Sequence, residues 1–226
     1  MSSGQASSSA SPAAATAGRL IALEGGEGTG KSTQIKLLQD FLQSQGKSVL
    51  VTREPGGTAG GEAIRALLVS GAVDRWDAVS ELLLHYAARR EHVIRLIKPA
   101  LARGEWVISD RFADSSLVYQ GMVQAVGIER VLDLHELVLG GFWPDLTLIL
   151  DLPASDGLDR ASARDQGQNG RYEEMGAAFH EAVGQGFRRL AARYPGRCVL
   201  VDAVGNPEAV AGRVAEAVRQ RLMAPA

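Results

Sequence analysis

The stretch LEGGEGTGKSTQIKLL at residues 23–38 has the pattern of a phosphate-binding loop. Gly25, Gly30, Lys31 and Ser32 match G-x-x-x-x-G-K-[ST], and the match lies between an apolar run and an amphipathic segment. Glycines let the backbone curl until its N–H groups point inward, and the following helix adds its dipole to the anion site. We expect Lys31 to reach the β- and γ-phosphates of a nucleoside triphosphate, and the Ser32 hydroxyl to bind Mg²⁺. The residues predicted to line this site are Gly25, Gly26, Glu27, Gly28, Thr29, Gly30, Lys31, Ser32 and Thr33.

Outside this loop, short apolar runs alternate with amphipathic segments. Alternation of this kind favours parallel strands with helices on both faces, so we predict an α/β, three-layer P-loop NTPase fold with a five-stranded parallel sheet flanked by helices. The strands are expected in RLIALEG, SVLVTREP, EWVISDR, PDLTLILDL and RCVLVDA. Helices are expected at 31–45, 60–70, 77–102 with Pro99 bending or dividing it, 113–124, 128–140 and 206–222.

Polar residues follow several of these strands directly. In parallel sheets ligands bind beyond the carboxyl ends of the strands. The phosphate loop follows the first strand, Arg53 and Glu54 follow the second, and Asp110 and Arg111 follow the third. The sequence therefore predicts one binding edge at which these side chains meet.

The composition excludes several other classes of protein. The chain has 226 residues and a formal net charge of −2, which gives no sign of broad nucleic-acid binding. No stretch approaches 18 uncharged apolar residues, so no membrane span is expected. Residues 1–18 are rich in Ser and Ala and carry no charge, which predicts a disordered tail before a domain at 19–224.

The phosphate loop alone does not separate a nucleotide-dependent switch from a kinase. The chain has no N-K-x-D for reading guanine, and the D-x-x-G at 202–205 lies too late in the chain to be a switch loop. A kinase that phosphorylates a second nucleotide needs cations for an acceptor that already carries charge, and a lid that excludes water. Arg53, Arg89 and Arg111 lie on separate segments that should converge at the binding edge. Surface salt bridges are the alternative for each arginine taken singly.

A polar stretch near residue 165 supplies the expected lid. Arg160, Arg164 and Arg171 flank RDQGQNGR at 164–171, which we predict to be a mobile loop within a short lid at about 154–172. These arginines are candidates to close over a transferring phosphoryl group.

Several segments together resemble the bacterial thymidylate kinases of the P-loop nucleoside monophosphate kinase family. GGEGTGKST, TREPGGT at 52–58, YAARREHV at 86–93, VISDRFADSSLVYQG at 107–121 and PDLTLILDLP at 144–153 follow that family's order and spacing. The resemblance covers about residues 19–222. It implies ATP-dependent phosphorylation of dTMP to dTDP with Mg²⁺ as cofactor, in dTTP synthesis. It also implies a cytoplasmic homodimer with ATP and dTMP as its ligands and no nucleic-acid or membrane partner.

The resemblance also implies roles for individual residues. Arg53, Arg89 and Arg111 resemble contacts of the acceptor phosphate, and Asp110 resembles a carboxylate near Mg²⁺ and the transferring group. Catalysis would then rest on Lys31, Asp110, Arg111 and Arg164, with Ser32 and Asp110 at the metal. Glu27 is similar to a residue that meets the 3′-hydroxyl of the acceptor, with a solvent-facing loop residue as the alternative. Ser115, Ser116 and Gln120 would read thymine or hold waters near it. Tyr119 would crowd the 2′ position of the sugar or pack in the core, and Arg160 would pack on adenine.

The chain departs from the family pattern at two places. His85 stands where the family usually has a Phe that stacks on thymine. Either His85 stacks there, or Tyr86 or another ring does and His85 is a packed helix residue. The lid segment RASARDQGQNGRYEE is a residue or two long, and Gly170 precedes Arg171 where an Asp is usual. For that reason the roles of Arg171 and Glu173 stay open, and Arg164 is the candidate lid arginine.

Other acceptors remain open at the level of sequence. One methyl group separates thymine from uracil, and a hydrophobic pocket gains only about 1–3 kcal/mol from it. A kinase for dUMP or dGMP is therefore the alternative within the same class. A nucleotide-binding switch that hydrolyses ATP slowly is the alternative from another class.

Overall fold

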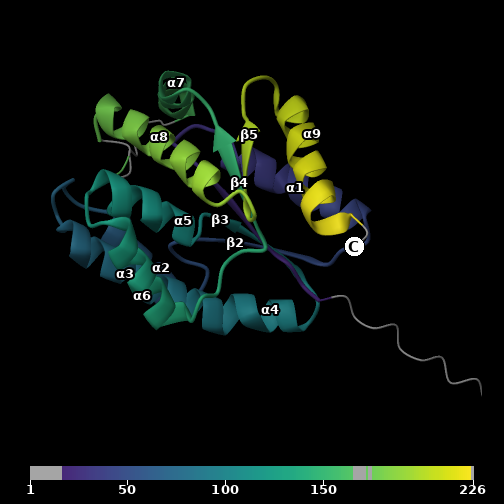
Figure 1. Cartoon of the computed structure of the whole chain (residues 1–226), viewed down its shortest axis with the longest axis horizontal. Helices are drawn as coiled ribbons and strands as arrows, with labels where there is room; N and C mark the ends of the chain where they lie inside the picture. Colours follow the sequence, from purple (N-terminus) through teal and green to yellow (C-terminus); the bar gives the residue numbers. More distant parts are fainter. Residues whose placement is uncertain (1–16, 165–171, 173–174, 225–226) are drawn as a thin grey trace, which may run out of the picture.

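The computed structural model describes residues 17–164, 172 and 175–224, with backbone alone for residues 161–164. Within this part of the chain, five parallel strands form one sheet in the order β2-β3-β1-β4-β5 (Figure 1). The predicted α/β fold with a five-stranded parallel sheet is confirmed. β1 lies at the centre, so the loop that follows it opens at the middle of the sheet edge.

The elements of the sheet alternate with helices along the chain. The strands are β1 Leu20–Gly25, β2 Val49–Arg53, β3 Trp106–Asp110, β4 Leu146–Asp151 and β5 Cys198–Asp202. The α-helices are α1 Lys31–Ser44, α2 Ala59–Val69, α3 Ala78–His92, α4 Lys98–Ala102, α5 Ala113–Ser116, α6 Ile128–Leu139, α7 Ala154–Arg164, α8 Ala177–Arg193 and α9 Pro207–Val218. Three π-helical turns, η1 Val93–Ile97, η2 Leu117–Val123 and η3 Arg219–Met223, continue α3, α5 and α9.

The two faces of the sheet are buried by different helices. On β1, Ile21 and Leu23 point to a cluster formed with α1 and α9, whereas Leu20 and Ala22 point to a cluster formed with η1 and α4. The α6, α8 and η2 segments complete the second face. Successive side chains of a strand point to opposite faces, so a strand that is buried on both sides must be apolar throughout. Figure 1 shows α1 and α9 together on one side of the sheet and α8 on the other.

The helix predicted at 77–102 runs without a break, but not as one α-helix. The N–H of Lys98 bonds to the carbonyl oxygen of Val93, five residues back, in the π turn that precedes Pro99. Pro99 then lies in the first turn of α4, where its missing N–H costs nothing. The expected bend is therefore accommodated by a wider turn. The predicted 113–124 helix likewise becomes α5 followed by the π turn η2.

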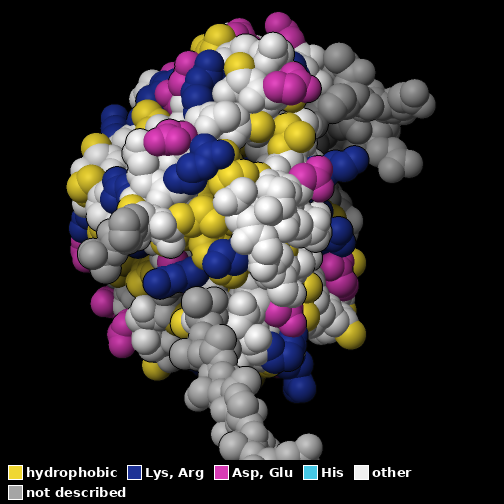
Figure 2. All heavy atoms as spheres, turned by 90° about the vertical axis from the view of Figure 1, so that its right-hand side faces the viewer, with side chains coloured by type: hydrophobic (Ala, Val, Ile, Leu, Met, Phe, Trp, Pro, Cys, Tyr) yellow, Lys and Arg dark blue, Asp and Glu magenta, His cyan; other side chains and the backbone are white. Residues whose placement is uncertain are grey.

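Two predictions concern residues that lie mostly outside the described ones. The predicted disordered tail at 1–18 overlaps the described chain only at residues 17–18. Of the predicted lid at 154–172, the part at 154–164 forms α7, and the predicted mobile loop falls on residues not described. In the described chain, no helix is both long and apolar enough to cross a membrane. On the face drawn in Figure 2, Lys and Arg side chains are interspersed with Asp and Glu side chains.

Candidate active site

The loop between β1 and α1 forms a curled cradle at the centre of the sheet edge. Gly25, Gly28 and Gly30 have φ values of 137°, 67° and 90°, a region that side chains with a Cβ rarely adopt. The Lys31 Nζ atom donates to the carbonyl oxygens of Gly26 at 2.8 Å and Gly25 at 3.3 Å. Burial lowers the pKa of Lys31 to about 8, with Arg111 adding to the effect. The ammonium group is thus held at the floor of the cradle.

A cavity of about 230 Å³ continues from this cradle along the ends of the neighbouring strands. The chain brings three guanidinium groups to it from different elements, together with two carboxylates outside the cradle. A site with this balance of charge is suited to an anion larger than one phosphate group. Its lining residues are Glu27, Gly28, Thr29, Gly30, Lys31, Ser32, Arg53, Glu54, Arg65, Asp110 and Arg111.

Arg53 and Arg65 form one wall of the cavity. Arg53 donates to both carboxylate oxygens of Glu62, at 3.0 and 3.1 Å, and about half of its side chain is exposed. Glu62 also accepts from the backbone N–H of Gly57, which ties Arg53 to the loop that follows β2. Arg65 donates to the carbonyl oxygen of Pro55 at 2.9 Å, and burial together with Arg53 lowers its pKa.

Arg65 is a site residue that the sequence reasoning missed. The signal was available, because Arg65 lies four residues after the buried Gly61 and three before the buried Leu68, on the same face of α2. A basic residue on the buried face of a helix that starts at the binding edge would have pointed to this cavity.

Arg111 is the third arginine that lines the cavity. Its φ of 69° is unusual for a residue other than glycine. Its Nη1 donates to the carbonyl oxygen of Gly25 at 3.1 Å and to Ser115 Oγ at 3.2 Å, and its backbone N–H bonds to Leu23. The guanidinium carbon also lies 5.4 Å from the ring centre of Tyr119. The left-handed backbone therefore directs the guanidinium back over the cradle.

Glu24 holds the turn that carries Arg111. It is fully buried and accepts from the backbone N–H groups of Phe112 at 2.8 Å and Ser115 at 3.1 Å, and from Ser115 Oγ at 2.6 Å. Burial raises the pKa of Glu24 to about 7, and Arg111 opposes the rise. Sequence reasoning assigned no role to Glu24, because its place within a predicted buried strand gave no sign of a separate function.

Asp110 is the residue that best fits a metal ion. Its Oδ1 atom is buried and has no hydrogen-bond partner among the described residues, although the carboxylate lines the cavity. No group of three or more His, Cys, Asp and Glu side chains suited to a metal ion occurs among the described residues. Mg²⁺ in nucleotide-binding enzymes is commonly held by one or two protein ligands together with substrate phosphates. Asp110 and Ser32 in one cavity with the cradle match that kind of site.

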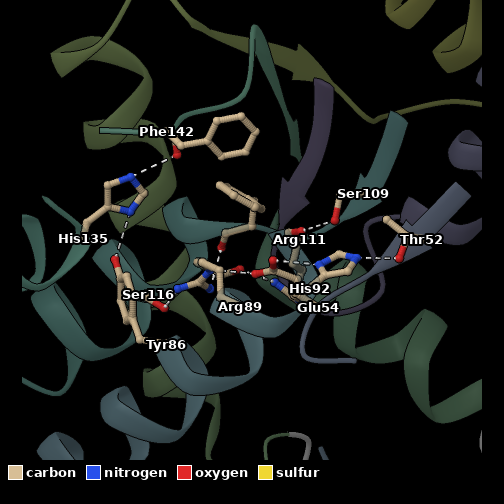
Figure 3. A network of polar contacts seen from close by, with 12 residues as sticks. Thr52, Glu54, Tyr86, Arg89, His92, Ser109, Arg111, Ser116, His135 and Phe142 are labelled. Atoms are coloured by element: carbon tan, nitrogen blue, oxygen red, sulfur yellow. Dashed lines mark hydrogen bonds and ion pairs between the residues drawn. The ribbon is translucent and has the colours of Figure 1, made fainter. Parts of the chain in front are cut away.

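The structure does not bring Arg89 to the phosphate cavity beside Arg53 and Arg111. Its side chain is 2% exposed and lies behind Glu54, with Nε 2.6 Å from Glu54 Oε2. Nη1 donates to Ser116 Oγ at 3.1 Å and Nη2 to the carbonyl oxygen of Phe112 at 3.2 Å (Figure 3). The position of the Arg89 side chain depends on how α3 packs. A sequence motif alone could not predict that position. Arg89 therefore links Glu54, which lines the cavity, to Ser116 by hydrogen bonds.

Comparisons with known proteins agree with this geometry. The family model described as thymidylate kinase matches residues 23–214. A thymidylate kinase of Caulobacter vibrioides is 54% identical over 92% of this chain and 99% of its own length, and one of Rhizorhabdus wittichii is 47% identical over 91% and 99%. The crystal structure of a thymidylate kinase from Ehrlichia chaffeensis is 31% identical, covers 89% of this chain and 99% of its own, and superposes with a TM-score of 0.73.

The chain belongs to the thymidylate kinase family. The predicted resemblance is therefore confirmed.

The remaining candidate residues of this family member gather around an aromatic cluster beside the cavity. His85 lies one helical turn before Arg89 on α3, and its Nε2 is 3.0 Å from Tyr172 Oη. The Tyr119 ring packs edge-on against Tyr172, with centroids 5.9 Å apart. Burial lowers the pKa of His85 to about 4, with Arg89 adding to the effect, so the imidazole is neutral at physiological pH. The cluster presents neutral rings, one of which, Tyr119, lies against the Arg111 guanidinium.

Tyr86, the alternative to His85 for stacking, lies elsewhere. It is 1% exposed, its hydroxyl lies 3.3 Å from His135 Nδ1, and its ring packs under the Arg89 guanidinium at 4.6 Å. A ring in that place supports Arg89 and has no free face for a base. Of the two candidates, His85 alone lies among the rings next to Tyr119.

Gln120 and Ser116 are both buried below this cluster. The Gln120 side-chain amide donates to Glu81 Oε1 at 2.7 Å, and Ser116 accepts from Arg89. Glu81, like Arg65 and Glu24, was missed by sequence reasoning, since one acidic residue in a helix gives no signal. Ser115, in contrast, lies on the cavity side between Glu24 and Arg111.

α7 places Arg160 and Arg164 above the cradle side of the molecule. The backbone of Gly157 in α7 packs directly on the backbone of Glu27 and Gly28 in the cradle. The Arg160 side chain is exposed, and the Arg164 side chain lies outside the described residues. Arg171 and Glu173 also lie outside the described residues.

Proposed function

We propose that this chain transfers the γ-phosphoryl group of MgATP to a phosphate oxygen of dTMP, giving dTDP for dTTP synthesis. The observation that carries the proposal is the continuous 230 Å³ cavity, in which the phosphate cradle and three arginines face one another in a member of the thymidylate kinase family. Two anionic nucleotides placed end to end require that arrangement.

The donor nucleotide occupies the cradle in this proposal. The backbone N–H groups of residues 25–33 and the start of α1 surround its phosphates, and Lys31 neutralises the β- and γ-phosphates. Ser32 and Asp110 hold Mg²⁺, which neutralises charge on the phosphates when it is bound. Arg160, exposed on α7, packs on the adenine ring.

The acceptor nucleotide occupies the other end of the cavity. Arg53, Arg65 and Arg111 surround its phosphate, and the left-handed turn at Arg111 aims this guanidinium between the two nucleotides. Glu27 meets the 3′-hydroxyl of the acceptor sugar, and Tyr119 limits the space at its 2′ position. The thymine base lies against His85 and is read by Ser115, Ser116 and Gln120, with Arg89 holding Ser116 in place.

Catalysis in this arrangement is positioning and charge neutralisation. The second pKa of a phosphate monoester is about 6, so the acceptor oxygen is ionised at neutral pH and needs no general base. Lys31 and Arg111 stabilise charge on the transferring group, and Arg164 joins them from the lid. Closure of the lid excludes water, which would otherwise accept the phosphoryl group.

The alternatives are less favoured. A kinase for dUMP or dGMP and a slow ATP-hydrolysing switch share the cradle, but the family match extends over the whole acceptor side. A switch also has no use for three arginines at a second anion site.

We further propose that two copies of the chain form a homodimer through α2, α3 and α6. Large apolar side chains on these elements and on η1 are exposed in the single chain, and α3 packs against both α2 and α6, so they lie on adjoining helices. They are Leu67, Val79, Leu83, Ile94 and Leu137. A cytoplasmic location stays a prediction of the family resemblance.

A coupled assay of ADP formation tests the activity. The eight common ribo- and deoxyribonucleoside monophosphates, dTMP among them, and dUMP serve as acceptors. We expect ADP formation that depends on dTMP and exceeds that with any other acceptor. Equal phosphate release with and without acceptor would contradict the proposal and support the switch.

The lid arginine is tested in the same assay. Arg164→Ala should lower kcat by about 10³-fold or more, as with other arginines that stabilise phosphoryl transfer. Arg219→Ala is the matched control, since Arg219 is exposed on η3, where it pairs with Glu216 and packs on the Phe41 ring, and it belongs to no candidate site. A loss below tenfold in Arg164→Ala would remove Arg164 from the mechanism.

A further inference from the structure

We propose that His92 is a positioning residue for the acceptor nucleotide, acting through Glu54. The inference rests on the proposed function, because it assigns Glu54 and its neighbours to the acceptor end of the cavity. His92 belongs to none of the site residues expected from the sequence. It is fully buried at the end of α3 and touches no part of the phosphate cradle in any hydrogen bond.

His92 lies in the middle of a chain of polar contacts that ends at the cavity. Its Nε2 is 2.7 Å from Thr52 Oγ1, and its Nδ1 is 3.0 Å from Glu54 Oε1. The other oxygen of Glu54, Oε2, accepts from Arg89 Nε at 2.6 Å. Figure 3 shows the imidazole between Thr52 and Glu54, with Arg89 on the far side of the carboxylate. Both oxygens of Glu54 are thus occupied, and its orientation is fixed from two sides.

The chemistry of the partners sets the direction of each hydrogen bond. Burial raises the pKa of Glu54, but Arg89 and His92 outweigh burial and hold it below its ordinary value, so the group is a carboxylate that only accepts. His92 Nδ1 must therefore carry a proton and donate it to Glu54. In the neutral ring Nε2 is then an acceptor, and the Thr52 hydroxyl donates to it. Glu54 in this way selects the tautomer of His92, and the Thr52 hydroxyl satisfies the remaining nitrogen by donating to it.

The imidazole also supports the loop that follows β2. A Cβ at Gly57, whose φ is 78°, would stand 2.6 Å from His92 Cδ2 and Nε2 and 2.7 Å from Thr52 Oγ1. The ring therefore fills the space that a side chain at this position would need. Arg53 at the end of β2 and Glu54 at the start of this loop both line the cavity. A change in the ring is transmitted to the cavity wall by packing as well as by hydrogen bonds.

A change at His92 should weaken the binding of the acceptor nucleotide and leave the binding of the donor nucleotide unchanged. Glu54 lines the part of the cavity with Arg53 and Arg65, and Arg89 reaches Ser116 and lies one turn from His85. Lys31, in contrast, bonds to Gly25 and Gly26 within the cradle itself. If Glu54 lost its fixed orientation, the side chains that we assign to dTMP binding would shift. The side chains that we assign to ATP binding would keep their positions.

Two amide variants distinguish the roles of the two ring nitrogen atoms of His92. His92→Asn places an amide nitrogen near the position of Nδ1 and retains a donor to Glu54, whereas His92→Gln places its amide near Nε2 and leaves Glu54 without that donor. We expect His92→Gln to raise KM for dTMP at least tenfold while KM for ATP stays within twofold. We expect His92→Asn to restore KM for dTMP to within threefold of the unchanged protein. A structural role alone would lower the melting temperature or the active fraction and leave both KM values unchanged.

A third variant keeps the test decisive if both amide variants fail to fold. Thr52→Val removes the hydroxyl at nearly constant shape and should raise KM for dTMP at least threefold, with KM for ATP unchanged. An unchanged KM for dTMP in His92→Gln, or in Thr52→Val where the first does not fold, would overturn the inference. So would an equal rise of both KM values. Absence of dTMP-dependent ADP formation in the unchanged protein would instead contradict the proposed function, and calorimetric binding of dTMP to the same variants would then decide the inference.

Discussion

The backbone of Gly28 in the phosphate cradle lies directly against the carbonyl group of Gly157 in α7, so that a methyl group at Gly28 would overlap that carbonyl oxygen. Gly157 in turn has the carbonyl oxygen of Glu27 in the place of a side chain. The cradle and the first part of the predicted lid are therefore in contact without any intervening side chain. This contact gives α7 a fixed base from which its arginines extend.

Replacement of Gly28 by Ala should disrupt this contact. The left-handed backbone at φ 67° costs an L-residue about 1–2 kcal/mol, and the methyl group cannot be accommodated without moving α7 or the cradle. We expect kcat/KM for ATP to fall by about 100-fold or more in steady-state kinetics. Gly212→Ala in α9 is the control, because no atom lies within 4 Å of its Cβ position, and this change should stabilise the fold by about 0.5–1 kcal/mol. Equal activity of the two variants would contradict the importance of the contact.

Binding of ATP should weaken above pH 8 because of Lys31. Burial lowers the pKa of Lys31 to about 8 in the free protein, so the side chain is charged below that pH and neutral above it. Since phosphates bind the charged form, Kd for ATP should rise about tenfold per pH unit above pH 8. Calorimetry from pH 6.5 to 9.5 measures this. Lys31→Arg keeps its charge over the whole range and should show weaker but pH-independent binding. A flat Kd in the unchanged protein up to pH 9.5 would be inconsistent with the lowered pKa.

Glu24 should make the stability of the fold depend on pH. Its pKa is raised to about 7 by burial, so the folded state favours the protonated carboxyl. The stabilising contribution is complete below pH 4.5 and is lost as the pH rises through 7, a loss of roughly 3 kcal/mol. Glu24→Gln cannot ionise. Its free energy of unfolding in urea, relative to the unchanged protein, should therefore rise by about 2–3 kcal/mol between pH 5 and pH 8. Glu208→Gln, exposed on α9, is the matched control. Parallel pH profiles for Glu24→Gln and the unchanged protein would refute the prediction.

His85 is expected to supply the face on which thymine stacks. A base stacked on an aromatic ring is worth about 1–3 kcal/mol, so His85→Ala should weaken dTMP binding by roughly 5- to 150-fold. His85→Phe should bind dTMP at least as tightly as the unchanged protein, because the neutral imidazole offers less apolar area than a phenyl ring. Both affinities are measured by calorimetry. Unchanged affinity in His85→Ala would rule out stacking on His85.

Much of the binding edge follows from local sequence. The pattern around Gly25 and Lys31 predicted the cradle because its glycines and its lysine act within one loop. Arg53 and Arg111 were found because each directly follows an apolar run, and the ends of parallel strands meet. Arg89 was expected beside Arg53 and Arg111 but lies behind Glu54, because the direction of its side chain depends on the packing of α3. Arg65 was missed although its spacing from the buried Gly61 and Leu68 on α2 indicated a place on the buried face.

What the sequence alone determined is the order of strands and helices, the phosphate cradle and the family, because each of these rests on residues that are neighbours along the chain. The tertiary structure alone decided which groups, distant in the sequence, pair with each buried charged side chain. Glu54 meets Arg89 and His92 only after β2 and α3 have packed together, and Glu24 reaches Phe112 and Ser115 only across the sheet. Buried charges must be paired where they lie, and their partners are set by the packing of whole elements, which no local pattern records.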